Sequence, residues 1–220
     1  MRKYKVLLGV LVVAVTLCIV YLFHYYYIHR YDPLIVRIST GYGLDPALVR
    51  ALVYEESYFN PQARSTAGAI GLMQVTPIIV REWSRVTGKQ QLAIAFPNVT
   101  AKIPKDDLKE MKDEDLLSNP EINLRIGCWY LDQLMHRYGN WGEPLPIVLA
   151  SYNAGPTNAL RWRERAAADP LRISANQYIE QIDFPETKRY VRNILLRYRK
   201  YKQNQYDLDR IGWLLGKEGN

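Results

Sequence analysis

The chain has 220 residues, of which 48% are hydrophobic, and this favours one folded domain with appendages over a disordered protein. The formal net charge is +7, but residues 1–31 hold four basic residues and no acidic ones, which leaves +3 (7 − 4) for residues 32–220. This mild charge comes without a basic helix or a zinc-ligand spacing, so we expect no nucleic-acid partner.

Residues 6–28 form an apolar or aromatic stretch in which Thr16 and His24 are the polar exceptions. A helix of that length can cross the hydrocarbon core of a membrane. Basic residues at positions 2, 3 and 5 precede it, so the positive-inside rule places the N-terminus in the cytoplasm. We therefore expect a single-pass protein of the inner (cytoplasmic) membrane, whose remaining residues face the periplasm or cell wall. Several tyrosines would form an aromatic belt at the outer interface: Tyr21, Tyr25, Tyr26, Tyr27 and Tyr31.

A cleaved signal peptide is the alternative interpretation of this stretch. No Ala-x-Ala-like site lies near the end of the apolar run. Cys18 raises the possibility of a lipoprotein, but Leu17 is bulky where a small residue is expected, and the apolar run continues beyond it. The sequence thus favours an uncleaved anchor.

The cysteines and histidines give no indication of a metal site. Cys18 lies in the apolar stretch and Cys128 in a predicted helix, so an intradomain disulfide is excluded. The histidines are scattered at positions 24, 29 and 136, without metal-ligand spacing. We expect neither a metal ion nor a cofactor.

The remaining elements are predicted to be helices. Residues 29–43 are expected to form a juxtamembrane linker with an amphipathic turn. Asp45 is a good N-cap and Pro46 fits the first turn of a helix over about 46–58. Asn119-Pro120 similarly begins a long helix that ends at Gly139. Further helices are predicted over about 77–86, 111–117, 146–152, 157–168 and 185–198, and no β alternation or internal repeat is evident.

The predicted organisation follows from these elements. Residues 1–28 are the cytoplasmic flank and transmembrane anchor, and residues 29–43 are the linker. Residues 44–203 form a mostly α domain, within which residues 88–114 are an irregular insert that contains Pro97 and Pro104. Residues 204–220 are expected to be a C-terminal tail.

Two glutamates lie in the apolar helix that ends near residue 58. A buried carboxyl group is costly unless it is paired or stays protonated, and a protonated acid near neutral pH is what general acid catalysis requires. Glu56 has apolar residues at helical spacings behind it, and so has Glu55, so periodicity does not choose between them. For either residue, a boundary position with the carboxylate in water is the simpler interpretation.

Four short segments, considered together, decide between a catalytic glutamate and a boundary glutamate. They are Glu56-Ser57, Gly71-Leu72-Met73-Gln74, Tyr152-Asn153-Ala154-Gly155-Pro156 and Glu186-Thr187-Lys188-Arg189-Tyr190-Val191. With Asn60-Pro61, Ser65 and Gly68-Ala69 between the first two, they resemble, in order, the signature of the soluble-lytic-transglycosylase (SLT) domain. The resemblance covers about residues 42–200 and implies a lysozyme-like, goose-type fold that cleaves peptidoglycan.

The resemblance also implies roles for individual residues. It selects Glu56 as the acid, because the family's acid directly precedes the serine, and it places Ser65 and Tyr190 near that acid. Glu186 would help to form the far wall of the cleft. Four further residues are expected to bind the glycan through apolar contacts and amide or hydroxyl groups: Met73, Gln74, Tyr152 and Asn153.

Structural roles remain open for three of these residues. Tyr190 could pack in the core with its hydroxyl outward, and Ser65 could satisfy local backbone groups. Glu186 could simply be favoured by the helix dipole at a helix N-terminus.

The function that we expect is that of a peptidoglycan lytic transglycosylase, an enzyme that cleaves the β-1,4 bond between N-acetylmuramic acid and N-acetylglucosamine. The resemblance implies one acid/base, Glu56, and products with 1,6-anhydro-muramyl ends. The alternatives are a goose-type lysozyme, which uses water, and a non-catalytic peptidoglycan-binding module of an envelope machine. The expected partners are glycan strands and the membrane, and the sequence does not identify any partner within an envelope complex.

Overall fold

The computed structural model describes residues 2–87, 116–166 and 173–203. This part of the chain contains nine helices, and its only β structure is two isolated bridges, Arg64–Ile70 and Ile70–Val75. The prediction of a mostly α fold is confirmed. The predicted insert at 88–114 and the tail at 204–220 lie outside the described residues.

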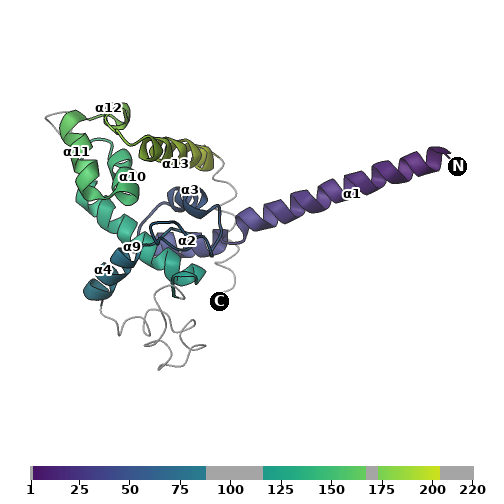
Figure 1. Cartoon of the computed structure of the whole chain (residues 1–220), viewed down its shortest axis with the longest axis horizontal. Coiled ribbons are helices and arrows are strands. Elements are labelled where there is room, and N and C mark those ends of the chain that lie inside the picture. Colours follow the sequence, from purple (N-terminus) through teal and green to yellow (C-terminus); the bar gives the residue numbers. More distant parts are fainter. Residues whose placement is uncertain (1, 88–115, 167–172, 204–220) are drawn as a thin grey trace, which may run out of the picture.

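Helix α1, Arg2–His29, extends away from the other helices (Figure 1). Most of its side chains are exposed, although most of them are apolar. Among the described residues it contains the one stretch that is long and apolar enough to cross a membrane. The retention of α1 as an uncleaved anchor stays a prediction.

Helix α2, Asp32–Gly41, differs from the linker that we expected over residues 29–43. Ile35 and Ile38 are buried, and α2 packs against both α3 and α9. Their spacing of three residues places them on one helix face, which explains why the segment folds onto the domain. The folded part therefore begins before residue 44.

A buried ion pair joins α2 to α3 beside the end of α1. The Arg50 Nε donates to the Asp32 Oδ1 over 2.7 Å, and the two side chains are only 5% and 1% exposed. The Asp32 Oδ2 also lies 2.6 Å from the His29 Nδ1. The Arg50 Nη2 donates to the carbonyl of Ile28 over 3.3 Å, so the C-terminal end of α1 is hydrogen-bonded to the domain.

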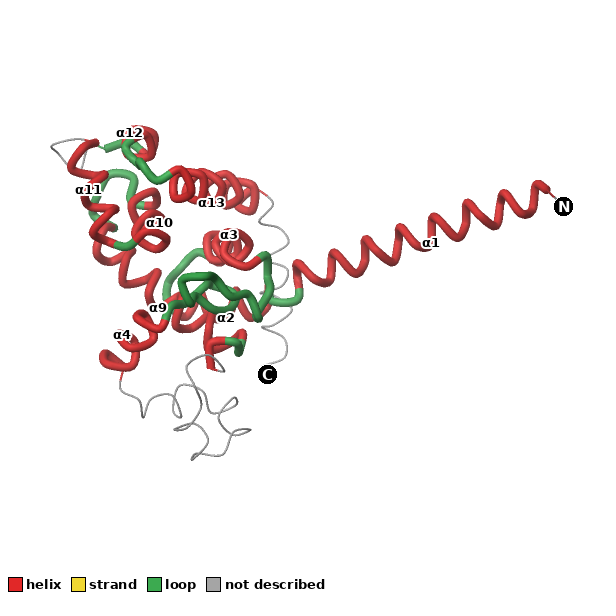
Figure 2. The backbone as a smooth tube through the Cα atoms, in the orientation of Figure 1, coloured by secondary structure: helices red, strands yellow, loops and turns green. Residues whose placement is uncertain are grey.

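Helix α3, Pro46–Ser57, begins and ends where specific residues change the backbone. The Asp45 carboxylate accepts a 2.9 Å hydrogen bond from the Ala47 N–H and caps the first turn. Tyr58 and Phe59 both adopt positive φ, in the left-handed region, and terminate the helix. The loop that follows turns back on itself before α4 begins (Figure 2).

Helix α9, Pro120–Tyr138, starts at Asn119, whose side chain accepts from the N–H groups of Glu121 and Ile122. It packs against α4, Pro77–Thr87, and against α10, Leu145–Ala154. Helices α11, Pro156–Ala166, and α13, Pro185–Gln203, also pack on α10.

A short helix that we did not predict, α12, spans Ala175–Glu180. Ser174 and Gln177 form a capping box at its start, because each side chain bonds the other residue's backbone N–H. The Ser-x-x-Gln spacing was therefore present in the sequence as a helix signal.

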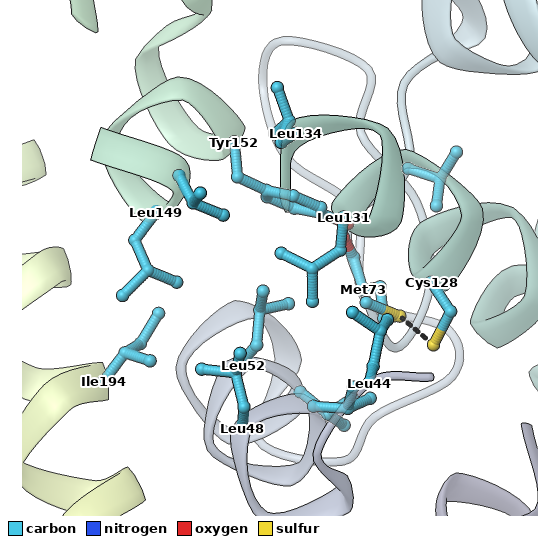
Figure 3. Close-up of a cluster of buried hydrophobic side chains, with 14 of the residues drawn as sticks. Leu44, Leu48, Leu52, Met73, Cys128, Leu131, Leu134, Leu149, Tyr152 and Ile194 are labelled. Carbon is cyan, nitrogen blue, oxygen red and sulfur yellow. Dashed lines mark hydrogen bonds between the residues drawn. The ribbon is translucent and has the colours of Figure 1, made fainter. Parts of the chain in front are cut away.

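The core lies between α3, α9, α10 and α13. Figure 3 shows Leu48 and Leu52 of α3 pointing toward Leu131 of α9, Leu149 of α10 and Ile194 of α13. Helix α3 is thus surrounded by the other helices, and its last turn carries the two glutamates.

Candidate active site

The loop from Gly71 to Gln74 is held to α9 by one buried amide. The Asn123 Nδ2 donates to the carbonyls of Ile70 and Leu117 over 2.7 and 2.9 Å. The Asn123 Oδ1 accepts from the Met73 N–H over 2.8 Å. Three buried backbone groups are thereby satisfied by one side chain, which fixes the loop beside the end of α3.

Two glycines allow this close approach. Gly71 has φ +82°, and a Cβ there would lie 2.2 Å from the Asn123 Nδ2 and 2.6 Å from the Leu117 carbonyl oxygen. A Cβ on Gly127 would lie 2.4 Å from the Met73 Sδ. Ser57 provides a further tie, because its hydroxyl donates to the Leu72 carbonyl over 2.9 Å.

Glu56 is hydrogen-bonded to the last helix. The Tyr190 hydroxyl donates to the Glu56 Oε1 over 2.5 Å, across 134 positions of sequence. Burial raises the pKa of Glu56 to about 7, although the Tyr190 hydrogen bond acts in the opposite direction and lowers it. The neighbouring Glu55 carboxylate adds to the rise. A proton is thus available on this carboxyl group near neutral pH.

A cleft of about 600 Å³ opens beside Glu56. Its walls come from the end of α3, the loop that follows, the starts of α4 and α13, and the end of α10. The lining residues are Glu55, Glu56, Ser65, Thr66, Ala67, Ala69, Gln74, Thr76, Ile79, Tyr152, Asn153, Glu186, Arg189 and Tyr190. The volume is within the range of sites that bind small organic ligands.

Six of the seven predicted substrate-binding residues lie in this cleft with Glu56: Ser65, Gln74, Tyr152, Asn153, Glu186 and Tyr190. Burial raises the pKa values of Tyr152 and Tyr190 well above the usual range of tyrosine, so both hydroxyls stay protonated. Their contacts with a glycan stay predictions.

Met73 is the exception, and its prediction requires a correction. Its side chain is fully buried rather than in the cleft lining, and its Sδ lies 4.0 Å from the Cys128 Sγ (Figure 3). The close contact with Gly127 shows why, because that glycine leaves room for the thioether in the core. Met73 acts on the cleft indirectly, since its carbonyl accepts from the Tyr152 hydroxyl over 2.9 Å.

Several cleft residues also bond their neighbours. The Gln74 amide group donates to the carbonyls of Ala63 and Gly71, which leaves its oxygen as the free acceptor. The Ser65 hydroxyl accepts from the Ala69 N–H, as the local structural alternative predicted. The Asn153 Oδ1 accepts from the Thr187 hydroxyl over 2.7 Å, which joins α10 to α13.

Glu55 also borders the cleft, although its helix position is rotated by about 100° from that of Glu56. Its Oε1 accepts from the Asn193 amide over 2.7 Å. Two hydrogen bonds thus join α3 to α13, one between Glu56 and Tyr190 and one between Glu55 and Asn193.

Sequence reasoning missed two contributors to the site. Arg189 lines the cleft, and its position three residues after Glu186 on a helix already assigned to the cleft could have indicated this. Asn123 gave the weaker signal of an amide in an apolar helix. Among the described residues, no group of three or more His, Cys, Asp or Glu side chains is placed to hold a metal ion.

These features define a mostly α protein whose polar cleft contains a glutamate of raised pKa, Glu56. The Transglycosylase SLT domain family matches residues 33–173, more than half of the chain. The chain therefore belongs to that family.

Two relatives illustrate the similarity. The soluble lytic murein transglycosylase of Salmonella typhimurium is 29% identical over 165 residues, which are 75% of this chain and 22% of the relative. The membrane-bound lytic murein transglycosylase C of Histophilus somni is 29% identical over 195 residues, covering 81% of this chain and 48% of the relative.

Solved structures agree with the expected lysozyme-like fold. The 70 kDa soluble lytic transglycosylase of Escherichia coli superimposes with a TM-score of 0.61 at 29% identity, covering 80% of this chain and 24% of that one. Lytic transglycosylase Slt of Pseudomonas aeruginosa, solved as an inactive glutamate-to-glutamine mutant, gives 0.60 at 31% identity over 78% and 24%. The chain thus spans about a quarter of the length of these proteins.

Proposed function

We propose that this protein is a lytic transglycosylase that cleaves the β-1,4 bond between N-acetylmuramic acid and N-acetylglucosamine in peptidoglycan. The observation that carries the proposal is Glu56, whose pKa is raised to about 7 by burial at the edge of a cleft. A general acid works best when its pKa is close to the operating pH. The inactive glutamate-to-glutamine mutant of the Pseudomonas aeruginosa relative supports an essential glutamate in this family.

The first step would be protonation of the leaving oxygen by Glu56. The Tyr190 hydroxyl donates to Oε1, so the proton for the substrate is expected on Oε2. As the bond between the anomeric carbon and that oxygen breaks, positive charge develops on the muramyl ring, and the substrate's own N-acetyl group would stabilise it.

The second step would close a ring within the product. The Glu56 carboxylate accepts the proton of the muramyl 6-hydroxyl, whose oxygen bonds the anomeric carbon and forms the 1,6-anhydro end. Glu56 is protonated again, and no water is consumed. Because this hydroxyl is tethered to the reacting ring, its effective molarity can far exceed that of mobile water.

A goose-type lysozyme activity is the alternative, and Glu186 is the observation that favours it. Hydrolysis usually requires a second carboxylate across the scissile bond. Glu186 is exposed and lines the same cleft, whereas the Glu55 carboxylate is engaged by Asn193. The two activities share the first proton transfer, so their products, rather than Glu56 variants, distinguish them.

The test is digestion of purified peptidoglycan followed by mass analysis of the fragments. We expect mostly 1,6-anhydro-muramyl ends, each lighter by one water than a hydrolytic end. A majority of reducing muramyl ends would instead favour the lysozyme. A folded protein that binds the polymer but releases no fragments would favour the non-catalytic binding module.

Two variants identify the acid in the same assay. Glu56→Gln keeps the side-chain shape and removes the titratable proton, so we expect a loss of at least about 10²–10⁴-fold in rate. Glu55→Gln is the matched control, because its amide oxygen can still accept from Asn193, and it should keep most of the activity. Inactivity of the Glu55 variant alone would contradict the assignment of Glu56.

We further propose that α1 anchors this activity to the inner membrane in a single pass, with the domain at residues 44–203 and helix α2 facing the periplasm or cell wall. The length and composition of α1 and the relatives named as membrane-bound support this placement. Its substrate partners would be glycan strands close to the membrane surface.

A further inference from the structure

Helix α13 carries three basic side chains near its start, and they have different surroundings. The Lys188 Nζ and the Arg192 Nη2 both pair with the Glu180 carboxylate at the end of α12, at 3.4 and 2.6 Å. Neither of these two residues lines the cleft. Arg189 does line it, and its guanidinium pairs with no carboxylate of the described chain.

Arg189 also differs in charge from the other ionisable residues of the cleft. The lining contains three glutamates, Glu55, Glu56 and Glu186, and Arg189 is its one cation among the described residues. An anionic group that approached Glu55 and Glu186 without a counter-charge would be repelled. The guanidinium is planar and offers paired N–H donors that match the geometry of a carboxylate.

Its place along the helix brings Arg189 close to the acid. Arg189 and Glu56 line the same cleft, and Tyr190, the residue after Arg189, bonds Glu56 directly. A group bound by Arg189 would therefore belong to the sugar at the scissile bond or to a substituent of that sugar.

We propose that Arg189 binds a carboxylate on the lactyl side chain of the muramyl residue, and so selects substituted glycan strands. This rests on the proposed function, because the muramyl residue is the sugar of peptidoglycan that carries such a group. The carboxylate has two possible sources. It is the lactyl carboxylate itself in a strand without peptides, or a carboxylate of the attached stem peptide.

The test measures binding, so that it does not depend on turnover. The full chain carrying Glu56→Gln, held in detergent micelles, is titrated with a defined muramyl tetrasaccharide in three forms. The lactyl group is free in the first, carries a dipeptide with free carboxylates in the second, and is blocked as a methylamide in the third. We expect at least one carboxylate form to bind about 3- to 10-fold tighter than the methylamide, as for an accessible charged pair.

Arg189→Gln in the same background should abolish that preference and leave binding of the methylamide unchanged. Arg189→Lys should restore part of it, because it keeps the charge but loses the fork of donors. Arg192→Gln is the matched control on the same helix and should retain the full preference. The form that shows the preference identifies the source of the carboxylate.

Two outcomes would overturn the proposal. Equal weakening of all three ligands by Arg189→Gln would indicate a general contact or a structural role, and unchanged binding would indicate no contact. A failure of the proposed function is distinguishable from either result. If the protein with Glu56 intact releases no fragments while the Arg189-dependent preference persists, the proposed reaction fails and the carboxylate site stands.

Discussion

Glu56 is subject to opposing influences on one carboxyl group. Burial disfavours its charged form and raises its pKa to about 7, while the hydrogen bond from Tyr190 stabilises the charged form and lowers it. A reaction that begins with proton donation by Glu56 requires the protonated form, and this form is lost as the pH rises through 7.

The pH dependence of the activity tests this balance. We expect kcat/KM to fall about tenfold for each pH unit above about 7, because Glu56 ionises there. Tyr190→Phe removes the hydrogen bond that lowers the pKa, so the descending limb should move to higher pH while the maximum rate decreases. The measurement is a pH profile of fragment release by both proteins.

Stability provides an independent check of the same pKa. The raised pKa means that Glu56 stabilises the fold relative to the unfolded chain below the unfolded value of 4.5, and that this contribution is lost as the pH rises to about 7. The free energy of unfolding of Glu56→Gln should therefore rise relative to that of the unsubstituted protein as the pH is raised across this window, by up to about 3 kcal/mol. A constant difference across the window would contradict a raised pKa.

Individual residues differ in how far the sequence could place them. The resemblance to the SLT family implied that Tyr190 lies near Glu56, and the two side chains are hydrogen-bonded. The same motifs placed Met73 in the cleft, although its side chain is in the core. A motif gives proximity to a site but not side-chain direction, and here the direction depends on the space left by Gly127, a residue 54 positions away (127 − 73).

At the scale of elements, the contact with Asn123 of α9 is one of the interactions that hold the loop after α3. The Gly71 backbone lies against the Asn123 side chain, which bonds three backbone groups around it. Displacing that side chain would leave buried polar groups without partners, at about 1–3 kcal/mol for each.

Two glycines of this loop form a matched pair of tests. Both have positive φ, +82° at Gly71 and +79° at Gly68, so alanine is strained at either position. A Cβ at Gly68 meets nothing within 4 Å, whereas at Gly71 it overlaps Asn123 and the Leu117 carbonyl. We expect Gly68→Ala to cost about 1 kcal/mol of unfolding free energy and Gly71→Ala several kcal/mol more, in chemical denaturation.

Equal costs for the two variants would show that backbone strain alone, rather than the contact with Asn123, governs the loop. The activity should follow the same order, because the loop carries the Gln74 side chain into the cleft.

A helix whose capping residues lie at its own ends is easier to predict from sequence than one that depends on contacts with distant elements. Helices α3 and α9 have local N-caps, Asp45 and Asn119, and were predicted with nearly their observed bounds. Helix α2 differs from the predicted linker, since the partners of its apolar face lie on α3 and on the distant α9. The burial of α2 depends on tertiary contacts, which the periodicity of its own residues does not reveal.

At the scale of the whole molecule, the domain is joined to α1 by specific contacts rather than by a free linker. The Arg30 Nη2 donates to the Phe59 carbonyl over 2.8 Å, and Arg50 bonds the Ile28 carbonyl. The sequence predicted a span from its apolar length, but the pairing of Arg50 with Asp32 requires the fold of α2 and α3. If α1 is retained in the membrane, the cleft is held at a limited distance from its surface.

The retention of α1 is the remaining prediction. We expect cell fractionation to recover the full-length chain in the membrane fraction and to show that a high-salt wash does not release it, because a spanning helix is held by apolar burial rather than by charge. A control variant, Tyr26→Ala with Ile28→Ala, introduces the small-x-small pattern that signal peptidase requires and that the natural chain lacks near the end of its apolar stretch. That variant should yield a shortened soluble form, which establishes that the assay detects cleavage. A shortened soluble form as the main species of the natural chain would instead identify α1 as a signal peptide.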